Sequence, residues 1–225
     1  MKKVLLQKLS EKIGSSGVLV LLLITVFIVP AIPGPELRRT LLSALLTIIF
    51  FMGVLAMEKY RKAMFWVAVM ALIAEWISFI FQLPLLDTLS QTTNILFFML
   101  IVARFIIQIA RKKEVDANVI IESIDGYLLL GMAYAVIVSV VHHNVPNAFK
   151  FPGTSGLDPY NPIYLNDYIY YTFVTFTTLG YGDITPLVPV SKSLSLLISI
   201  SGQIYIAIII AMLVGKYASN PHKPE

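Results

Sequence analysis

The segment "TTLGYGD", Thr177–Asp183, interrupts an otherwise apolar chain with two glycines, a tyrosine between them and an aspartate. Into it runs an aromatic and threonine-rich stretch, "YIYYTFVTFTT", whose roughly three helical turns are too short to cross a membrane. After it comes "ITPLVP", whose two prolines cannot continue a helix. We therefore expect a short helix that leads into this segment, with Asn166 or Asp167 as its N-cap.

The composition is that of an integral membrane protein. Of 225 residues, 57% are hydrophobic and only 13% are charged, whereas a soluble domain carries about a quarter charged residues. The absence of cysteine excludes disulfides, thiolate metal sites and a cysteine nucleophile. The sequence shows no carboxylate pair, nucleophile–base set or metal-ligand cluster, so we expect no enzymatic activity.

Six segments are long and apolar enough, or nearly so, to cross a bilayer, which takes about 20 residues. They are Ile13–Ile32, Thr40–Met57, Ala63–Leu83, Leu89–Ile109, Ile124–Val141 and Val190–Val214. If the N-terminus is inside, twelve Lys and Arg residues flank the spans on the cytoplasmic side and four on the outside. This bias predicts that both termini are cytoplasmic. It also accounts for the net charge of +4 without nucleic acid as a partner.

Residues 1–12, "MKKVLLQKLSEK", place Val4, Leu5 and Leu9 roughly on one helical face and lysines elsewhere. This pattern fits a helix that lies in the membrane interface, with lipid as its partner. A short basic flank that only sets the topology fits equally well.

Backbone that is not helical is tolerated at membrane depth only where it is buried in protein or lines a water-filled path. Gly180 and Gly182 alternate with Leu179 and Tyr181, and glycine reaches backbone conformations that are closed to other residues. This alternation could let successive carbonyl oxygens point toward one axis. Such a row of oxygens can replace the hydration shell of a cation.

The five residues "TLGYG", Thr178–Gly182, resemble the selectivity filter of potassium channels, whose usual form is TVGYG. The segments "GYLLLGMAYAVI" and "SGQIYIAIIIAMLVGKY" also look like small prokaryotic potassium channels with six transmembrane helices. The resemblance covers residues 124–215. It implies an all-α membrane protein with a four-helix N-terminal bundle and a two-helix pore domain that contains a re-entrant pore helix. Because the family's filter needs four loops and this chain has one, it also implies a homotetramer.

The resemblance further implies a role for individual residues. K+ would be held by the carbonyl oxygens, with a side-chain hydroxyl as the innermost ligand, and no organic cofactor is expected. These ion-coordinating residues are Thr178, Leu179, Gly180 and Tyr181. Many relatives have a Trp that bonds the filter aspartate; Tyr170 stands at this position, and its hydroxyl could bond Asp183 in the same way. Val174 stands where some relatives have a glutamate. The residues expected to support the filter are Thr177, Gly182, Asp183, Tyr170 and Val174.

The last span carries the expected cavity and gate. One face of this helix, at a spacing of three or four residues, is formed by Gln203, Ile206, Ile210 and Val214. We expect this face to line the inner cavity and, near Ile210 and Val214, its cytoplasmic constriction; Gln203 could instead bond a neighbouring helix. Gly202 occupies the position of the family's hinge glycine. A close contact between helices is the alternative reading of Gly202.

Residues 13–110 resemble a voltage-sensor domain but lack its arginine ladder. The register of the fourth span contains one charge, Arg104, and moving one charge across the whole field is worth about 2.3 kcal/mol per 100 mV. Steep voltage gating is therefore not expected. Glu75 lies inside the third span and should be paired, with Arg104 as the candidate partner. The pair could be a structural ion pair or part of a moving sensor, and a protonated Glu75 is the third alternative. Residues 111–123 are expected to be a linker, and residues 216–225 a cytoplasmic tail.

These observations predict a potassium-selective channel of the cell membrane, the inner membrane of a bacterium by resemblance, that conducts K+ passively without strong voltage gating. A weakly selective cation channel is the alternative, because Leu179 and Tyr170 depart from the usual filter and its support. A non-conducting scaffold or a transporter is a further alternative. Transporters often contain two related halves with interrupted helices, whereas this chain has one interrupted region.

Overall fold

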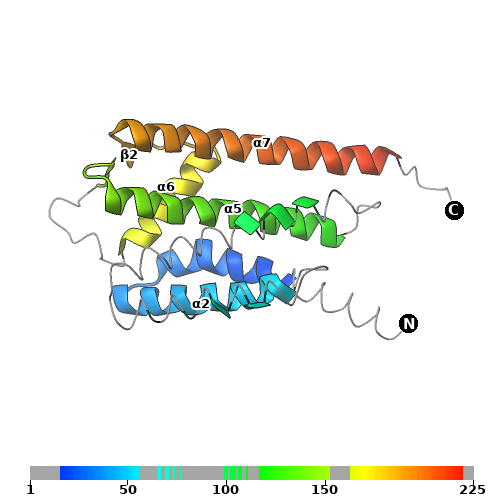
Figure 1. Ribbon diagram of the computed structural model, residues 1–225, viewed down its shortest axis with the longest axis horizontal. Helices are drawn as coiled ribbons and strands as arrows, with labels where there is room; N and C mark the ends of the chain where they lie inside the picture. Colours follow the sequence, from blue (N-terminus) through cyan, green and yellow to red (C-terminus); the bar gives the residue numbers. More distant parts are fainter. Residues whose placement is uncertain are drawn as a thin grey trace.

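A computed structural model describes residues 16–55, 117–152 and 163–219, together with 65–66, 69–70, 73, 77, 99–100, 102–104, 106–107 and 110. Within these ranges the chain is mostly helical. Figure 1 shows long helices that lie side by side, with α7 above α5, the N-terminal hairpin below α5, and α6 crossing between them. The start of the segment Ser16–Ala31, in dark blue, and the end of α7, in red, lie toward the same end of the molecule (Figure 1).

The first hairpin contains the helical segment Ser16–Ala31 and the helix α2, Pro35–Leu55. The first segment ends in a π-helical part, η1 (Ile24–Ile28), and a 3-10 turn, η2 (Val29–Ala31). Gly34 then turns the chain with φ +94°. Helix α2 begins at Pro35, earlier than the expected Thr40, because proline fixes a helical φ and its missing N–H is not needed in the first turn.

The third and fourth expected spans, Ala63–Leu83 and Leu89–Ile109, are described only at scattered residues, and each of these is helical. Residues 1–12 and Glu75 lie outside the described residues. The pairing of Glu75 with Arg104 therefore stays a prediction.

The C-terminal part contains α5 (Ala117–Asn144), α6 (Ile163–Phe176) and α7 (Pro189–Ser219). Two helices, Ala117–Asn144 and Pro189–Ala218, are long and apolar enough to cross a membrane. Helix α5 extends beyond the expected span Ile124–Val141, because its first turns carry acidic side chains that are buried against the protein instead of ending the helix in water.

Helix α6 begins at Ile163, so the expectation that Asn166 or Asp167 caps it is wrong. Asn166 is 6% exposed and lies inside the helix. Its amide, oriented with the oxygen toward the Arg38 guanidinium, accepts hydrogen bonds from Nε at 3.1 Å and from Nη1 at 2.6 Å. Arg38 belongs to α2, so this side chain is used for a contact between the hairpin and α6.

A two-stranded antiparallel sheet, which the sequence did not predict, joins β1 (Phe149–Lys150) to β2 (Thr185–Pro186). Phe149 pairs with Pro186, and Lys150 pairs with Thr185. The bond from the Leu187 N–H to the Ala148 carbonyl, at 2.9 Å, extends this contact. The sheet thus joins the chain that follows TTLGYGD to the chain that follows the C-terminal end of α5.

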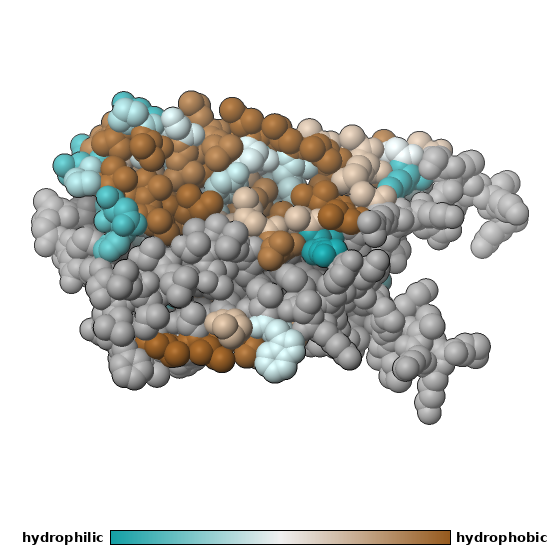
Figure 2. Space-filling model, in the orientation of Figure 1, coloured by the Kyte–Doolittle hydropathy of each residue, from teal (hydrophilic) through white to brown (hydrophobic). Residues whose placement is uncertain are grey.

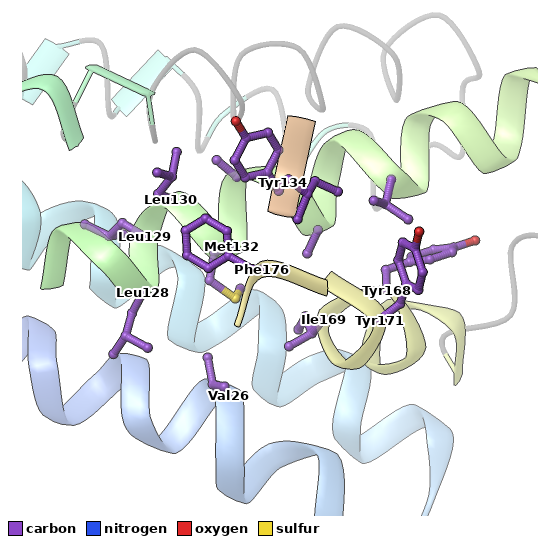
Figure 3. Packing of buried hydrophobic residues seen from close by; sticks show 14 of the residues in the cluster. Val26, Leu128, Leu129, Leu130, Met132, Tyr134, Tyr168, Ile169, Tyr171 and Phe176 are labelled. Carbon is purple, nitrogen blue, oxygen red and sulfur yellow. The ribbon is translucent and has the colours of Figure 1, made fainter. Parts of the chain in front are cut away.

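The core surrounds α6. Figure 3 shows its Tyr168, Ile169, Tyr171 and Phe176 among apolar side chains of α5, with Val26 of the first hairpin on the other side. Lipid is as apolar as these side chains, so their contact in a membrane is stabilised by close packing. Helix α7 is covered far less. Figure 2 shows a largely hydrophobic surface over it, and polar residues gathered at the end that carries the loops.

Candidate ion-conduction site

The end of α6 is tied directly to the first half of TTLGYGD. Four consecutive N–H groups, those of residues 177–180, turn back and donate to carbonyl oxygens of the last turn of α6 over 2.9–3.1 Å. The bonds run from Thr177 to Phe173, from Thr178 to Thr175, and from both Leu179 and Gly180 to Val174. The carbonyl of Val174 thus holds two residues of the segment.

The backbone of the segment alternates in sign. Thr178, Gly180 and Gly182 have φ values of +62°, +59° and +78°, whereas Leu179 and Tyr181 between them are not among the residues with positive φ. Alternation of left- and right-handed conformations turns successive peptide groups the same way, so that N–H groups gather on one side and carbonyls on the other. The glycines have the freedom that the sequence analysis assigned to them.

Thr178 is the unexpected member of this series. A β-branched residue with positive φ is an outlier, and holding it there costs about 1–3 kcal/mol. Its own N–H donates to Thr175, and the N–H groups of the residues on either side of it, Thr177 and Leu179, donate to Phe173 and Val174. Strain of this kind gathers at functional sites.

The backbone carbonyl oxygens of residues 178–181 accept no hydrogen bond from the described residues. Among the hydrogen bonds of residues 163–219, none ends on the backbone carbonyl oxygen of residues 178–181. The side chains of Leu179 and Tyr181 are 56% and 67% exposed. The segment therefore offers a row of unpaired oxygens and two large side chains that its own chain does not cover.

Two acidic residues, Asp167 and Asp183, lie near the C-terminal end of the segment. The Tyr170 hydroxyl donates a hydrogen bond of 2.8 Å to Asp183 Oδ2, which is the bond that the sequence analysis proposed. This bond raises the pKa of Tyr170. Burial raises the pKa of Asp167, Arg38 counteracts this shift, and Asp183 adds to it. Arg38 thus balances negative charge at this mouth.

Replacing Tyr170 by phenylalanine is expected to weaken ion discrimination, because Asp183 loses the donor that fixes the end of the segment. We expect potassium flux into liposomes to fall and sodium flux to rise relative to the native protein. Tyr217→Phe is the matched control, because it removes the hydroxyl of a tyrosine that is 72% exposed near the C-terminal end of α7, far along the chain from Asp183. Unchanged flux ratios in Tyr170→Phe would show that the hydrogen bond has no part in selectivity.

The expected cavity residues share the uncovered side of α7. Gln203, Ile206, Ile210 and Val214 are all exposed in the single chain, the last two at 55% and 60%. The alternative prediction for Gln203 was a hydrogen bond to a neighbouring helix, and the described residues show no such bond. These side chains are therefore available to face a path or a second chain.

Gly202 lies against the end of α6. A Cβ at Gly202 would overlap the backbone carbonyl oxygen of Phe176 and lie 2.8 Å from Cδ2 of its ring. Helix α7 continues without a break through this position. The structure thus contains the close helix contact that was the alternative reading of Gly202, while the hinge stays a prediction.

Helix α5 contains a buried acidic pair that was not predicted from the sequence. Glu122 and Asp125 are 2% and 0% exposed, and neither carboxylate oxygen of Asp125 has a hydrogen-bond partner among the residues that the structure describes. The signal was visible as "ESIDG" at the start of an apolar helix, but residues 111–123 were interpreted as a linker.

Asp125→Asn is expected to increase stability, because burying an ionised carboxylate without a partner costs more than burying a neutral amide of the same shape. The midpoint of thermal unfolding in detergent should rise. The control Glu36→Gln removes an exposed acid of α2 and should shift the midpoint little. A lower midpoint for Asp125→Asn would mean that the charge itself is needed for folding.

Two apolar helices of membrane-spanning length have between them a short helix and a row of carbonyls with no hydrogen bond from the described residues, which is the arrangement expected for a pore unit. The comparison with known families agrees. Residues 127–218 match a family model described as "Ion channel". This stretch of the chain is therefore similar to an ion-channel domain, and the match together with the two long apolar helices favours a membrane protein. No solved structure matches the chain.

Proposed function

We propose that the protein is a potassium-selective channel that conducts K+ passively through four copies of the TTLGYGD segment. The observation that carries this proposal is the alternation of φ at Thr178, Gly180 and Gly182, together with the absence of any hydrogen bond from the described residues to the carbonyls of residues 178–181. Carbonyl oxygens in such a row replace the hydration shell of K+. The Thr178 hydroxyl would supply the innermost ligand, and no organic cofactor is required.

The homotetramer is supported by what a single chain leaves uncovered. Leu179, Tyr181 and the exposed apolar side of α7 need partners, and one chain supplies one filter segment. In the assembly, Gln203 and Ile206 would line the cavity. Ile210 and Val214 would form a hydrophobic constriction that closes by dewetting.

Weak dependence on voltage is part of the proposal. Arg104 is the charge of the fourth span, and one such charge contributes about 2.3 kcal/mol per 100 mV even when it crosses the whole field. The positive charges of the loops favour a multi-pass protein of the cell membrane with both termini in the cytoplasm.

A weakly selective cation channel is the second candidate. Tyr170 reaches Asp183 through a single hydrogen bond that is exposed in the chain, and Leu179 stands in the place of the usual valine. Loose support at the outer end would let the ring of carbonyls adapt to Na+.

The test is ion flux into liposomes that contain the purified full-length protein, with K+ or Na+ as the permeant ion and the voltage varied. Potassium flux far above sodium flux, with a shallow voltage profile, supports the proposal. Equal fluxes of the two ions would favour the second candidate. Folded tetramers that carry neither ion under any voltage would count against conduction and favour a scaffold.

A further inference from the structure

Helix α7 is fastened to α5 by a buried tyrosine. The Tyr205 hydroxyl donates a hydrogen bond of 2.9 Å to the backbone carbonyl of Ser123. Tyr205 is 6% exposed, so this bond between α5 and α7 lies inside the protein. A hydrogen bond is directional, unlike apolar packing, so it limits how far α7 can slide or rotate on α5.

A glycine makes room for the hydroxyl. A Cβ at Gly126 would overlap Tyr205 Oη, whereas it would lie 3.3 Å from Cζ and 3.7 Å from Cε2 of the same ring. The conflict is therefore with the hydroxyl and much less with the ring. Gly126 forms a notch in α5 that admits a tyrosine at this position of α7.

The same tyrosine is linked to the base of the TTLGYGD segment. The ring of Tyr127 lies between Tyr205 and Phe176, with centroid distances of 5.8 Å and 4.6 Å. Phe176 directly precedes Thr177, and its carbonyl fills the gap at Gly202, one turn above Tyr205 on α7. Helix α7 is thus in close contact with two neighbours about one turn apart: Tyr205 fits against Gly126 of α5, and Gly202 fits against Phe176 of α6.

We propose that Tyr205 is a positioning residue of the pore: its hydroxyl, seated in the Gly126 notch, holds α7 so that Phe176 keeps the first residue of the filter in its conducting position. The inference rests on the proposed channel function. The side chains of α7 beyond Tyr205 are mostly exposed, whereas Tyr205 itself is buried three residues from the contact of Gly202 with Phe176, so its seated hydroxyl holds the part of α7 that touches the base of the filter.

The experiment uses Tyr205→Phe, Gly126→Ala and the double variant in the full-length protein, measured by single-channel recording in planar bilayers. Each single variant is expected to lower the fraction of time spent conducting by about fivefold, the size of one lost hydrogen bond. The conductance of the open pore and the K+/Na+ ratio should stay unchanged, because the filter carbonyls are untouched. If Tyr205 only stabilised the fold, the variants would lower the unfolding midpoint without a specific change in the fraction of time spent conducting.

The double variant provides the decisive comparison. Since the new Cβ conflicts with the hydroxyl, Tyr205→Phe should relieve Gly126→Ala, so the double variant should behave like Tyr205→Phe alone. The thermal unfolding midpoint should show the same relief, and this measurement needs no conduction. Additive effects in both measurements would overturn the inference. If the native protein conducts no ions, the channel function fails, while the unfolding measurements still decide whether the hydroxyl occupies the notch.

Discussion

Gly180→Ala is expected to abolish selective potassium flux while the protein still folds. Gly180 has φ +59°, and a non-glycine residue in this region costs about 1–2 kcal/mol. Alanine would relax toward negative φ and turn the Leu179 carbonyl away from its neighbours. The ion would lose a ring of ligands in each assembly, and potassium flux in liposomes should fall by about 100-fold.

Gly34→Ala is the matched control for this experiment. Gly34 also has positive φ, +94°, and at both glycines an added Cβ would meet nothing within 4 Å of it in the chain. The two variants therefore carry the same kind of local strain, but Gly34 lies in the turn before α2. We expect Gly34→Ala to keep its flux. Similar losses in both variants would mean that strain alone, and not the carbonyl row, explains the effect.

Gly202→Ala is expected to destabilise the protein, because its Cβ would overlap a backbone oxygen that cannot rotate away. Overpacking of this kind costs about 1–3 kcal/mol. The thermal unfolding midpoint in detergent should fall, and potassium flux should fall with it, since the oxygen belongs to Phe176 beside the filter.

Gly215→Ala is the control, because it lies in the same helix with nothing within 4 Å of the new Cβ. Alanine in a helix interior is favoured over glycine by about 1 kcal/mol, so this variant should be as stable as the native protein or more stable. If Gly202→Ala folded with native stability and changed only the opening of the pore, Gly202 would be a hinge and the contact with Phe176 incidental.

The pore unit could be predicted from the sequence because its signals are local. Apolar length gave α5 and α7, and the two glycines at Thr177–Asp183 indicated irregular backbone after a short helix. The bond between Tyr170 and Asp183 was also foreseen, because the family resemblance supplied the pair.

Other features depend on contacts between distant segments. The positive φ of Thr178 runs against the preference of threonine and is held by bonds to α6. The start of α6 was misplaced because Asn166, a good cap by its chemistry, is used by Arg38. Nothing in a local pattern reports that an acid such as Asp125 will be buried, or that β1 will pair with β2.

The contact between Arg38 and Asn166 bears on how the protein is made. The two residues are far apart in the chain but meet within one copy of it, and so do Val26 and the side chains around α6. The first hairpin is synthesised before α6, so it can fold first and provide a surface against which the later helices pack. Each newly synthesised chain is thus expected to form these contacts within itself, and a truncated chain that ends before Ile163 should keep the hairpin but lack the helix that contacts Arg38.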